Sequence, residues 1–377
     1  MLSSFSQSRT SGWISRDCEL GLDVIAERTP SWTWIWPTTG AAVILIKQFV
    51  SSGGSVTTIA AITLIGAVFA AVYHAEVLAH RIGEPFGTLV LALAVTTIET
   101  ALIVSMMLAA PAEQAALARD TVFAAVMIVC NGTVGACLLA GGTRFGEQGF
   151  QLQGASAALA VLAALTSMTL IFPNFTGGDP YYSSSQLAFA ALVSLVLYGS
   201  FIFIQTVRHR DYFLLEETKD EHIAISTKTA AASAALLFVS LVVIVALAKV
   251  LTPAVEAGVT YLNSPKAVVG IVIAALVLLP ESLAAVRAAR KNQLQTSLNL
   301  ALGSALATIG LTIPAVATVS LLTNQPLELG LELKDRDMLG LTIILSVITL
   351  GTGRTTLLQG VVHLVLFAAF LFFAFVP

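Results

Sequence analysis

The chain alternates between long apolar segments and short polar loops from about residue 32 to its end. A helix needs roughly 20 consecutive apolar residues to cross the hydrocarbon core of a bilayer. Measured against that length, the pattern predicts eleven transmembrane helices, of which the first and the tenth are the shortest. The predicted helices cover residues 33–49, 56–78, 86–109, 120–140, 153–173, 185–207, 229–251, 266–288, 296–322, 338–353 and 357–376.

Composition supports immersion in a membrane. Of the 377 residues, 56% are hydrophobic and 11% are charged, whereas soluble domains carry about 25% charged residues. A chain with so little charge cannot cover itself with a water-facing surface, so we expect a polytopic all-α membrane protein that contacts the lipid bilayer. No dense basic run suggests binding to nucleic acid, and no pattern indicates an oligomeric state.

The lysines and arginines indicate the orientation of the predicted helices. The N-terminal tail and every second loop carry 13 of them, and the loops on the other side carry six. Because positive residues concentrate on the cytoplasmic side, this bias places the N-terminus in the cytoplasm and, with eleven helices, Pro377 outside. The first thirty residues are polar and mixed, which is typical of a cytoplasmic tail and not of a secretory signal peptide.

An acidic loop at residues 208–228 divides the chain. It contains Glu216, Glu217, Asp220 and Glu221, and it is either a solvated linker or a loop that collects cations or regulates the protein. The predicted division is a tail with an extra helix at 1–55, a five-helix half at 56–207, the linker at 208–228 and a second five-helix half at 229–377. An odd number of helices makes the halves run in opposite directions, and such inverted repeats place their substrate site at the interface near the bilayer midplane.

Two acidic residues lie inside predicted helices, where a charge is costly. Glu99 is deep in the helix at 86–109 and Glu281 is in the helix at 266–288, each in the second helix of its half. An ionised carboxylate near the bilayer centre costs several kcal/mol, so such residues normally pair, bind ions or carry protons. We expect the two to converge on one cavity. The alternative is a glutamate at a helix end that reaches water, particularly for Glu281, which Arg287 follows.

Neutral oxygen-bearing residues near the glutamates suit a hard cation, which prefers oxygen ligands. Thr96 and Thr97 come just before Glu99, and Asn299 and Ser304 lie in the predicted ninth helix. These four residues are candidate supporting ligands. The alternatives are that a threonine hydroxyl bonds the preceding helical turn and that small residues serve close helix packing.

A polar group at the predicted cytoplasmic end of the second helix is a candidate for proton access. It includes His74, Glu76 and Glu84, and histidine titrates near neutral pH. A role in proton access or pH sensing is one interpretation, and ordinary polar residues at a membrane interface are the other. His363 in the last helix is interpreted as a packing residue, with a proton relay as the alternative.

Four stretches of the sequence resemble those of a known transporter family. They are residues 74–87, 141–148, 299–314 and 353–363. Together they resemble the calcium/proton exchanger family of the cation/calcium exchanger superfamily, and most closely its bacterial calcium-or-sodium/proton antiporters. The resemblance implies two inverted five-helix halves plus an N-terminal helix, a bacterial inner-membrane location, and one essential cation-binding glutamate per half, here Glu99 and Glu281. It also implies a secondary transporter of inorganic cations and protons, without a cofactor, and not an enzyme.

The chain departs from the family pattern beside both glutamates. A Gly-Asn pair usual in the family is replaced by Val95-Thr96 in the first half and by Val277-Leu278 in the second, and Ser282 stands where a histidine often follows the second glutamate. The expected function is calcium/proton exchange by alternating access that extrudes the cation, in which protons and the cation compete for the buried carboxylates. Because two amide ligands are lost, sodium or potassium is the alternative substrate. A cation channel and a membrane-embedded enzyme are the less favoured classes.

Overall fold

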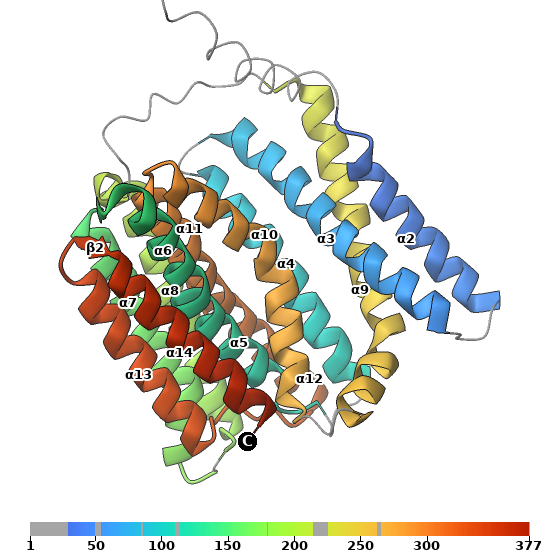
Figure 1. Cartoon of the computed structure of the whole chain (residues 1–377). Coiled ribbons are helices and arrows are strands. Elements are labelled where there is room, and N and C mark those ends of the chain that lie inside the picture. The colour runs from blue at the N-terminus through green and yellow to red at the C-terminus, as the bar shows by residue number, and fades with distance from the viewer. Residues whose placement is uncertain are drawn as a thin grey trace, which may run out of the picture.

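The protein is built almost entirely of helices, as the computed structural model in Figure 1 shows. The structure describes residues 29–49, 54–83, 86–109, 114–178, 180–213, 225–261 and 265–376. The α-helices are α2 (Trp32–Phe49), α3 (Gly54–Ile82), α4 (Phe86–Ala109), α5 (Leu117–Met127), α6 (Val134–Phe145), α7 (Leu152–Thr166), α8 (Ser184–Phe203), α9 (Thr227–Tyr261), α10 (Ala267–Arg290), α11 (Leu294–Ala307), α12 (Ile313–Thr323), α13 (Leu333–Leu350) and α14 (Leu357–Phe375). Shorter segments are the π-helices η1 (Ile128–Thr133), η2 (Ser167–Ile171), η4 (Ile204–Arg208) and η6 (Thr308–Thr312), and the 3-10 helices η3 (Phe172–Phe175) and η5 (Arg210–Tyr212).

Over the residues that the structure describes, the helices form eleven rods, which match the eleven predicted spans. Some rods join two α-helices through a π segment: α5 continues through η1 into α6, and α11 through η6 into α12. In the part of the chain that the structure describes, nine rods are long and apolar enough to cross a membrane. The other two rods, α2 and α13, are less apolar. Helix α2 contains three tryptophans and three threonines, and α13 has four charged residues in its first turns. The prediction of a polytopic all-α membrane protein is confirmed.

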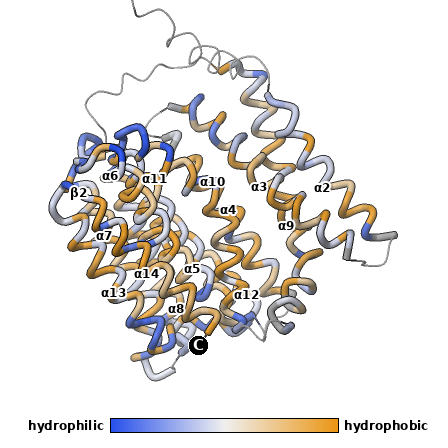
Figure 2. The backbone as a smooth tube through the Cα atoms, in the orientation of Figure 1, coloured by the Kyte–Doolittle hydropathy of each residue, from blue (hydrophilic) through white to orange (hydrophobic). Residues whose placement is uncertain are grey.

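The rods are arranged in two packed groups (Figure 1). α2, α3 and α9 lie together on one side, and their apolar core reaches one face of α4 and α10, through residues such as Ile98 and Val269. A larger core fills the space between the remaining rods, which we call the main bundle. We call α2, α3 and α9 the three-helix layer. Hydrophobic residues occupy most of each rod and hydrophilic ones gather mainly at the rod ends (Figure 2), as immersion in a bilayer requires.

Polar contacts hold the three-helix layer together. The ring of His74 on α3 is fully buried, and its two nitrogens lie 3.3 Å from Ser233 Oγ on α9 and 3.3 Å from the Thr33 carbonyl oxygen on α2. At the end of α3, Arg81 donates to the Ile225 carbonyl oxygen just before α9 (2.8 Å). The extra helix α2, which belongs to neither predicted half, is thereby fixed to the first helix of each half.

Contacts between the predicted halves follow a reciprocal pattern. The first helices, α3 and α9, pack on each other, and so do the fourth, α7 and α13. The fifth helix of each half packs on the third rod of the other half: α8 on α12, and α14 on α6. The second helix of each half also packs on the third rod of the other half: α4 on η6, and α10 on α5. Reciprocal contacts of this kind arise when two inverted repeats are related by a two-fold axis. Strands β1 (Glu147–Gly149) and β2 (Arg354–Thr356) pair antiparallel and join loops of the two halves.

Candidate functional site

Glu99 and Glu281 are both buried inside the main bundle. Glu99 on α4 is 1% exposed and Glu281 on α10 is 9% exposed. The rod that begins with α11 packs against both α4 and α10. The two glutamates therefore lie on different helices that share one neighbour.

That shared rod supplies a hydroxyl to each glutamate. Thr308 Oγ1 donates to Glu99 Oε2 (2.7 Å), and Ser304 Oγ donates to Glu281 Oε2. Ser304 and Thr308 are four residues apart, which is about one helical turn, so their hydroxyls lie on the same face of the rod. The two carboxylates, from opposite halves of the chain, converge on adjacent turns of one rod and lie within electrostatic range of each other.

The carboxylate of Glu99 is hydrogen-bonded through only one of its oxygens. Oε2 accepts from Thr308, whereas Oε1 is buried and has no hydrogen-bond partner among the described residues. Buried polar atoms in native proteins are normally hydrogen-bonded, and a buried carboxylate oxygen without a partner is costly unless it carries a proton or binds a cation. Glu99 Oε1 thus has a lone pair that no described residue occupies.

Two pairs of hydroxyls flank the glutamates. Thr100, next to Glu99, has its Oγ1 3.1 Å from Thr312 Oγ1. Ser282, next to Glu281, has its Oγ 2.8 Å from Thr133 Oγ1. Each pair joins a helix of one half to a rod of the other, so hydroxyl contacts cross the interface between the halves on both sides of the site.

The sequence prediction included Ser304 but missed Thr308 and Thr312. The three residues recur every four positions along one rod and carry a hydroxyl at each turn. That spacing was the pattern from which they could have been identified, because residues four apart share a helical face.

The two predicted threonines before Glu99 have different surroundings. Thr96 is buried on α4, about one turn before Glu99. Thr97 is exposed, and its hydroxyl donates to the Leu93 carbonyl oxygen one turn earlier (2.7 Å). This bond is the local alternative that threonine has in any helix.

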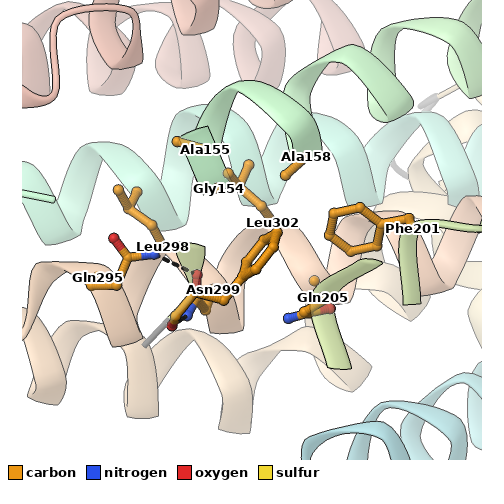
Figure 3. A pocket seen from close by; sticks show the side chains of 11 residues that line it. Gly154, Ala155, Ala158, Phe201, Gln205, Gln295, Leu298, Asn299 and Leu302 are labelled. Carbon is orange, nitrogen blue, oxygen red and sulfur yellow. Dashed lines mark hydrogen bonds between the residues drawn. The ribbon is translucent and has the colours of Figure 1, made fainter. Parts of the chain in front are cut away.

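The structure does not bring Asn299 to the glutamates. Asn299 lines a small pocket between α7, α8 and α11, and Figure 3 shows it joined to Gln295 by a hydrogen bond (2.8 Å). Its amide nitrogen donates to the Phe213 carbonyl oxygen (2.5 Å). Five residues separate it from Ser304, so it lies more than one turn away on a different face of α11. Its contacts fasten the segment that follows α8 to α11.

The predicted proton-access residues that the structure describes, His74 and Glu76, both lie on α3. His74 is enclosed within the three-helix layer, as described above. Glu76, two residues further along α3, is half-buried and lies within electrostatic range of His80, Arg287 and Glu281. Glu84 lies outside the described residues. The structure thus places Glu76, and not His74, nearest to the glutamate pair.

A model of the sodium/calcium exchanger protein family matches this chain over residues 54–207 and 232–376. The matched stretches contain Glu99, Glu281 and both of their hydroxyl partners, Ser304 and Thr308. The chain belongs to this family. Membership confirms the predicted resemblance to cation exchangers and the predicted class of antiporter.

Two bacterial relatives are similar to this exchanger over most of its length. It is 48% identical over 363 residues to the y4hA protein of Sinorhizobium fredii, covering 94% of this chain and 99% of that protein. It is 36% identical over 323 residues to the sodium-potassium/proton antiporter ChaA of Escherichia coli, covering 84% of this chain and 88% of that protein.

Solved structures share the fold of this exchanger. YfkE superposes with a TM-score of 0.69 at 17% identity, covering 92% of this chain and 100% of that one. The H+/Ca2+ exchanger CAX superposes with a TM-score of 0.70 at 15% identity, covering 95% and 89% of the two chains. At such low identity the likeness concerns the fold alone, and that fold is the one in which the two glutamates converge here.

The side-chain groups that bond the two glutamates of this exchanger are hydroxyls, so the donor atoms at the site are all oxygens. Within the residues described, no group of three or more His, Cys, Asp and Glu side chains is arranged to hold a metal ion. Carboxylate and hydroxyl oxygens are ligands for hard cations such as sodium, potassium and calcium. The site suits a cation that is bound and released as a substrate.

Proposed function

We propose that this exchanger is a cation/proton antiporter in which Glu99 and Glu281 bind either the transported cation or protons. The observation that carries the proposal is the convergence of two buried carboxylates on Ser304 and Thr308, with Glu99 Oε1 left without a hydrogen-bond partner among the described residues. Ionisable residues at this depth in a membrane protein normally belong to an ion or proton pathway.

Competition for the same oxygens couples the two fluxes. When both glutamates are ionised, the site carries two negative charges, which a bound cation neutralises in whole or in part. When both are protonated, the site is neutral without a cation. Moving the site between the two sides of the membrane is easier in either compensated form than in the empty, doubly charged form, because an uncompensated buried charge is costly. Alternating access of the site then exchanges cations for protons.

Two observations favour different cations. The relative with 36% identity is named a sodium-potassium/proton antiporter, which makes sodium or potassium the first candidate, in line with the missing Gly-Asn pairs. The double negative charge of the glutamate pair matches one calcium ion, and calcium takes six to eight oxygen ligands. Two bidentate carboxylates with Ser304 and Thr308 would provide about six, which keeps the predicted calcium/proton exchange as the second candidate.

The charge bias of the loops supports an orientation with the N-terminus in the cytoplasm of a bacterial cell and the C-terminus outside. In that orientation the inward proton gradient across the inner membrane drives the cation out. Glu76, His80 and Arg287 then lie towards the cytoplasmic side of Glu281. Glu76 is the candidate for passing protons or cations between the cytoplasm and the site.

The experiment is cation-induced collapse of a proton gradient in everted membrane vesicles from cells that lack their own antiporters. Respiration sets up the gradient, a pH-sensitive dye reports it, and sodium, potassium and calcium chloride are added separately. Glu99→Gln and Glu281→Gln keep the shape of the side chain but cannot ionise, so each is expected to abolish the response. Glu147→Gln is the matched control, because Glu147 lies in the surface strand β1 and its side chain is 54% exposed.

Full exchange by either buried variant would contradict the mechanism. A wild-type protein that responds to none of the three cations would contradict antiport altogether. Cation flux that proceeds at the same rate with no accompanying proton movement would favour the channel alternative.

A further inference from the structure

The last helix contributes a fully buried histidine to a polar network behind the glutamate site. His363 on α14 has its Nδ1 3.1 Å from Asn131 Oδ1 on η1 and its Nε2 3.0 Å from Thr349 Oγ1 on α13. Asn131, also fully buried, donates from Nδ2 to Thr342 Oγ1 on α13 (2.9 Å). The Thr342 hydroxyl donates in turn to the Met338 carbonyl oxygen (2.8 Å). Three rods therefore meet in one connected network.

With the side-chain oxygen of Asn131 facing the ring, the partners indicate how the imidazole is oriented. An amide oxygen only accepts, so the His363 Nδ1 carries a hydrogen that it donates to Asn131. The Nε2 atom lies 3.0 Å from the Thr349 hydroxyl, which is able to donate to it. Each of these donors and acceptors has a partner, so the network is a saturated one, which fixes a single arrangement of its members. A ring held by hydrogen bonds to two rods positions its neighbours.

The network acts on the π segment η1, which passes between the network and the glutamate site. Asn131 points from η1 to α13 and α14, whereas Thr133, two residues later, points to Ser282 on α10 (2.8 Å). Ser282 is adjacent to Glu281 in α10. A π turn has one more residue than an α turn and is frequently found at functional sites, because it redirects the side chains around it.

Close packing makes the link between α14 and this rod stiff. Gly360 on α14 lies against the backbone of α6, where a Cβ atom would come within 2.6 Å of the Leu139 nitrogen. Gly135 on α6 lies against His363, where a Cβ atom would come within 3.0 Å of the histidine Cβ. The absence of side chains at these two positions lets the backbones approach, so a change at His363 is transmitted to η1 instead of being absorbed by loose packing.

We propose that His363 is a positioning residue for the cation site: through Asn131 it fixes the π segment η1, and η1 holds Thr133 on Ser282 so that Glu281 keeps its place against Ser304. The inference rests on the proposed function, since it assumes that Glu281 binds the cation. It goes further by assigning a role in cation affinity to a residue that touches neither glutamate.

The experiment measures both the half-saturating cation concentration and the maximal rate in everted vesicles, with sodium, potassium or calcium chloride, whichever the wild type transports. His363→Leu removes both ring hydrogen bonds, and Thr342→Val removes the acceptor of the Asn131 amide with almost no change in volume. Both are expected to raise the half-saturating concentration by roughly 2- to 30-fold, the range for residues that act on a site through packed neighbours. The maximal rate per folded protein should stay near the wild-type value.

Two further variants separate positioning from packing. His363→Gln retains one donor and one acceptor and is expected to return the half-saturating concentration towards the wild-type value. Thr169→Val is the matched control, because it removes a fully buried hydroxyl that donates only to the Leu165 carbonyl oxygen of its own rod (2.7 Å). It should leave the half-saturating concentration unchanged.

Thermal unfolding of the purified variants in detergent completes the test. If His363→Leu and Thr342→Val lower the melting temperature but leave the half-saturating concentration unchanged, the network serves packing alone and the inference is overturned. It is also overturned if Thr169→Val shifts that concentration equally. A wild-type protein without cation-dependent proton movement would instead refute the proposed function, so the two failures are distinguishable.

Discussion

The hydroxyl of Thr308 allows a direct test of the site, because Thr308→Val removes it with almost no change in volume. This hydroxyl donates to Glu99 Oε2 (2.7 Å), while the other carboxylate oxygen has no partner among the described residues. A hydrogen bond to a charged group contributes about 1.5–3 kcal/mol. We take the lower value because a bound cation also stabilises the carboxylate. A loss of about 1.5 kcal/mol corresponds to a roughly tenfold weaker apparent affinity for the cation at fixed pH.

The assay is the half-saturating cation concentration in everted vesicles, measured at several pH values. Thr308→Ser keeps the hydroxyl and is expected to stay near the wild type. The hydroxyl stabilises the ionised form of Glu99, whether the cation is bound or not, so its loss acts mainly by favouring the proton in the competition. The defect of Thr308→Val should therefore shrink as the pH rises and fewer protons compete.

Two results would refute this reasoning. The first is a half-saturating concentration for Thr308→Val within about twofold of the wild type at the lowest pH tested, because a change that small corresponds to less than the weakest charged hydrogen bond. The second is a defect that does not depend on pH. In that case the hydroxyl would contribute to cation binding directly and not through competition with protons.

Two more predictions concern packing and charge in the main bundle. A Cβ atom on Gly270 would come within 2.8 Å of the Asp120 backbone carbon, so Gly270→Ala should destabilise the protein by about 1–3 kcal/mol through overpacking. Gly340→Ala is the control, because a Cβ atom there would meet open space, and it should leave the stability unchanged. Arg119 bonds both Asp120 and Glu328, so Arg119→Gln should destabilise the protein by about 3 kcal/mol, the lower end for breaking a buried pair, because the Glu328 side chain is 24% exposed. Chemical unfolding in detergent measures both, and an unchanged midpoint for Arg119→Gln would show that the ion pairs add nothing to stability.

The transmembrane rods were predictable because the bilayer imposes a length of apolar chain on each of them. Their ends were not: α9 runs from Thr227 to Tyr261, well beyond the predicted 229–251, since hydropathy marks the hydrocarbon layer while a helix continues until its backbone hydrogen bonds stop. The π segments were also outside the reach of the sequence. In η1, for example, Asn131 makes hydrogen bonds to α13 and α14, which lie more than 200 residues further along the chain.

The two glutamates were predictable for an energetic reason, because a charge inside an apolar helix has few uses other than ion or proton binding. Ser304 was also among the predicted ligands, but which hydroxyl bonds which carboxylate required the structure. The bond from Thr308 to Glu99 joins residues 209 positions apart, and it depends on the rotation of one rod about its axis relative to another. Hydropathy contains no information on that rotation, which is why Asn299 and Thr308 were equally eligible by position and only Thr308 meets a carboxylate.

The chemistry of the site repeats only in part between the two predicted halves: Thr100–Thr312 and Ser282–Thr133 correspond, but the hydroxyls that bond the carboxylates do not. Thr308 and Ser304 precede Thr312 by four and eight positions, and at the same spacings before Thr133 the other rod has Val129 and Ala125, both buried. Both carboxylates therefore take their hydroxyls from the rod of α11 and η6 in the second half. In the proposed mechanism, a shift or rotation of this single rod would change the hydrogen bonding of both carboxylates together, because both accept from it.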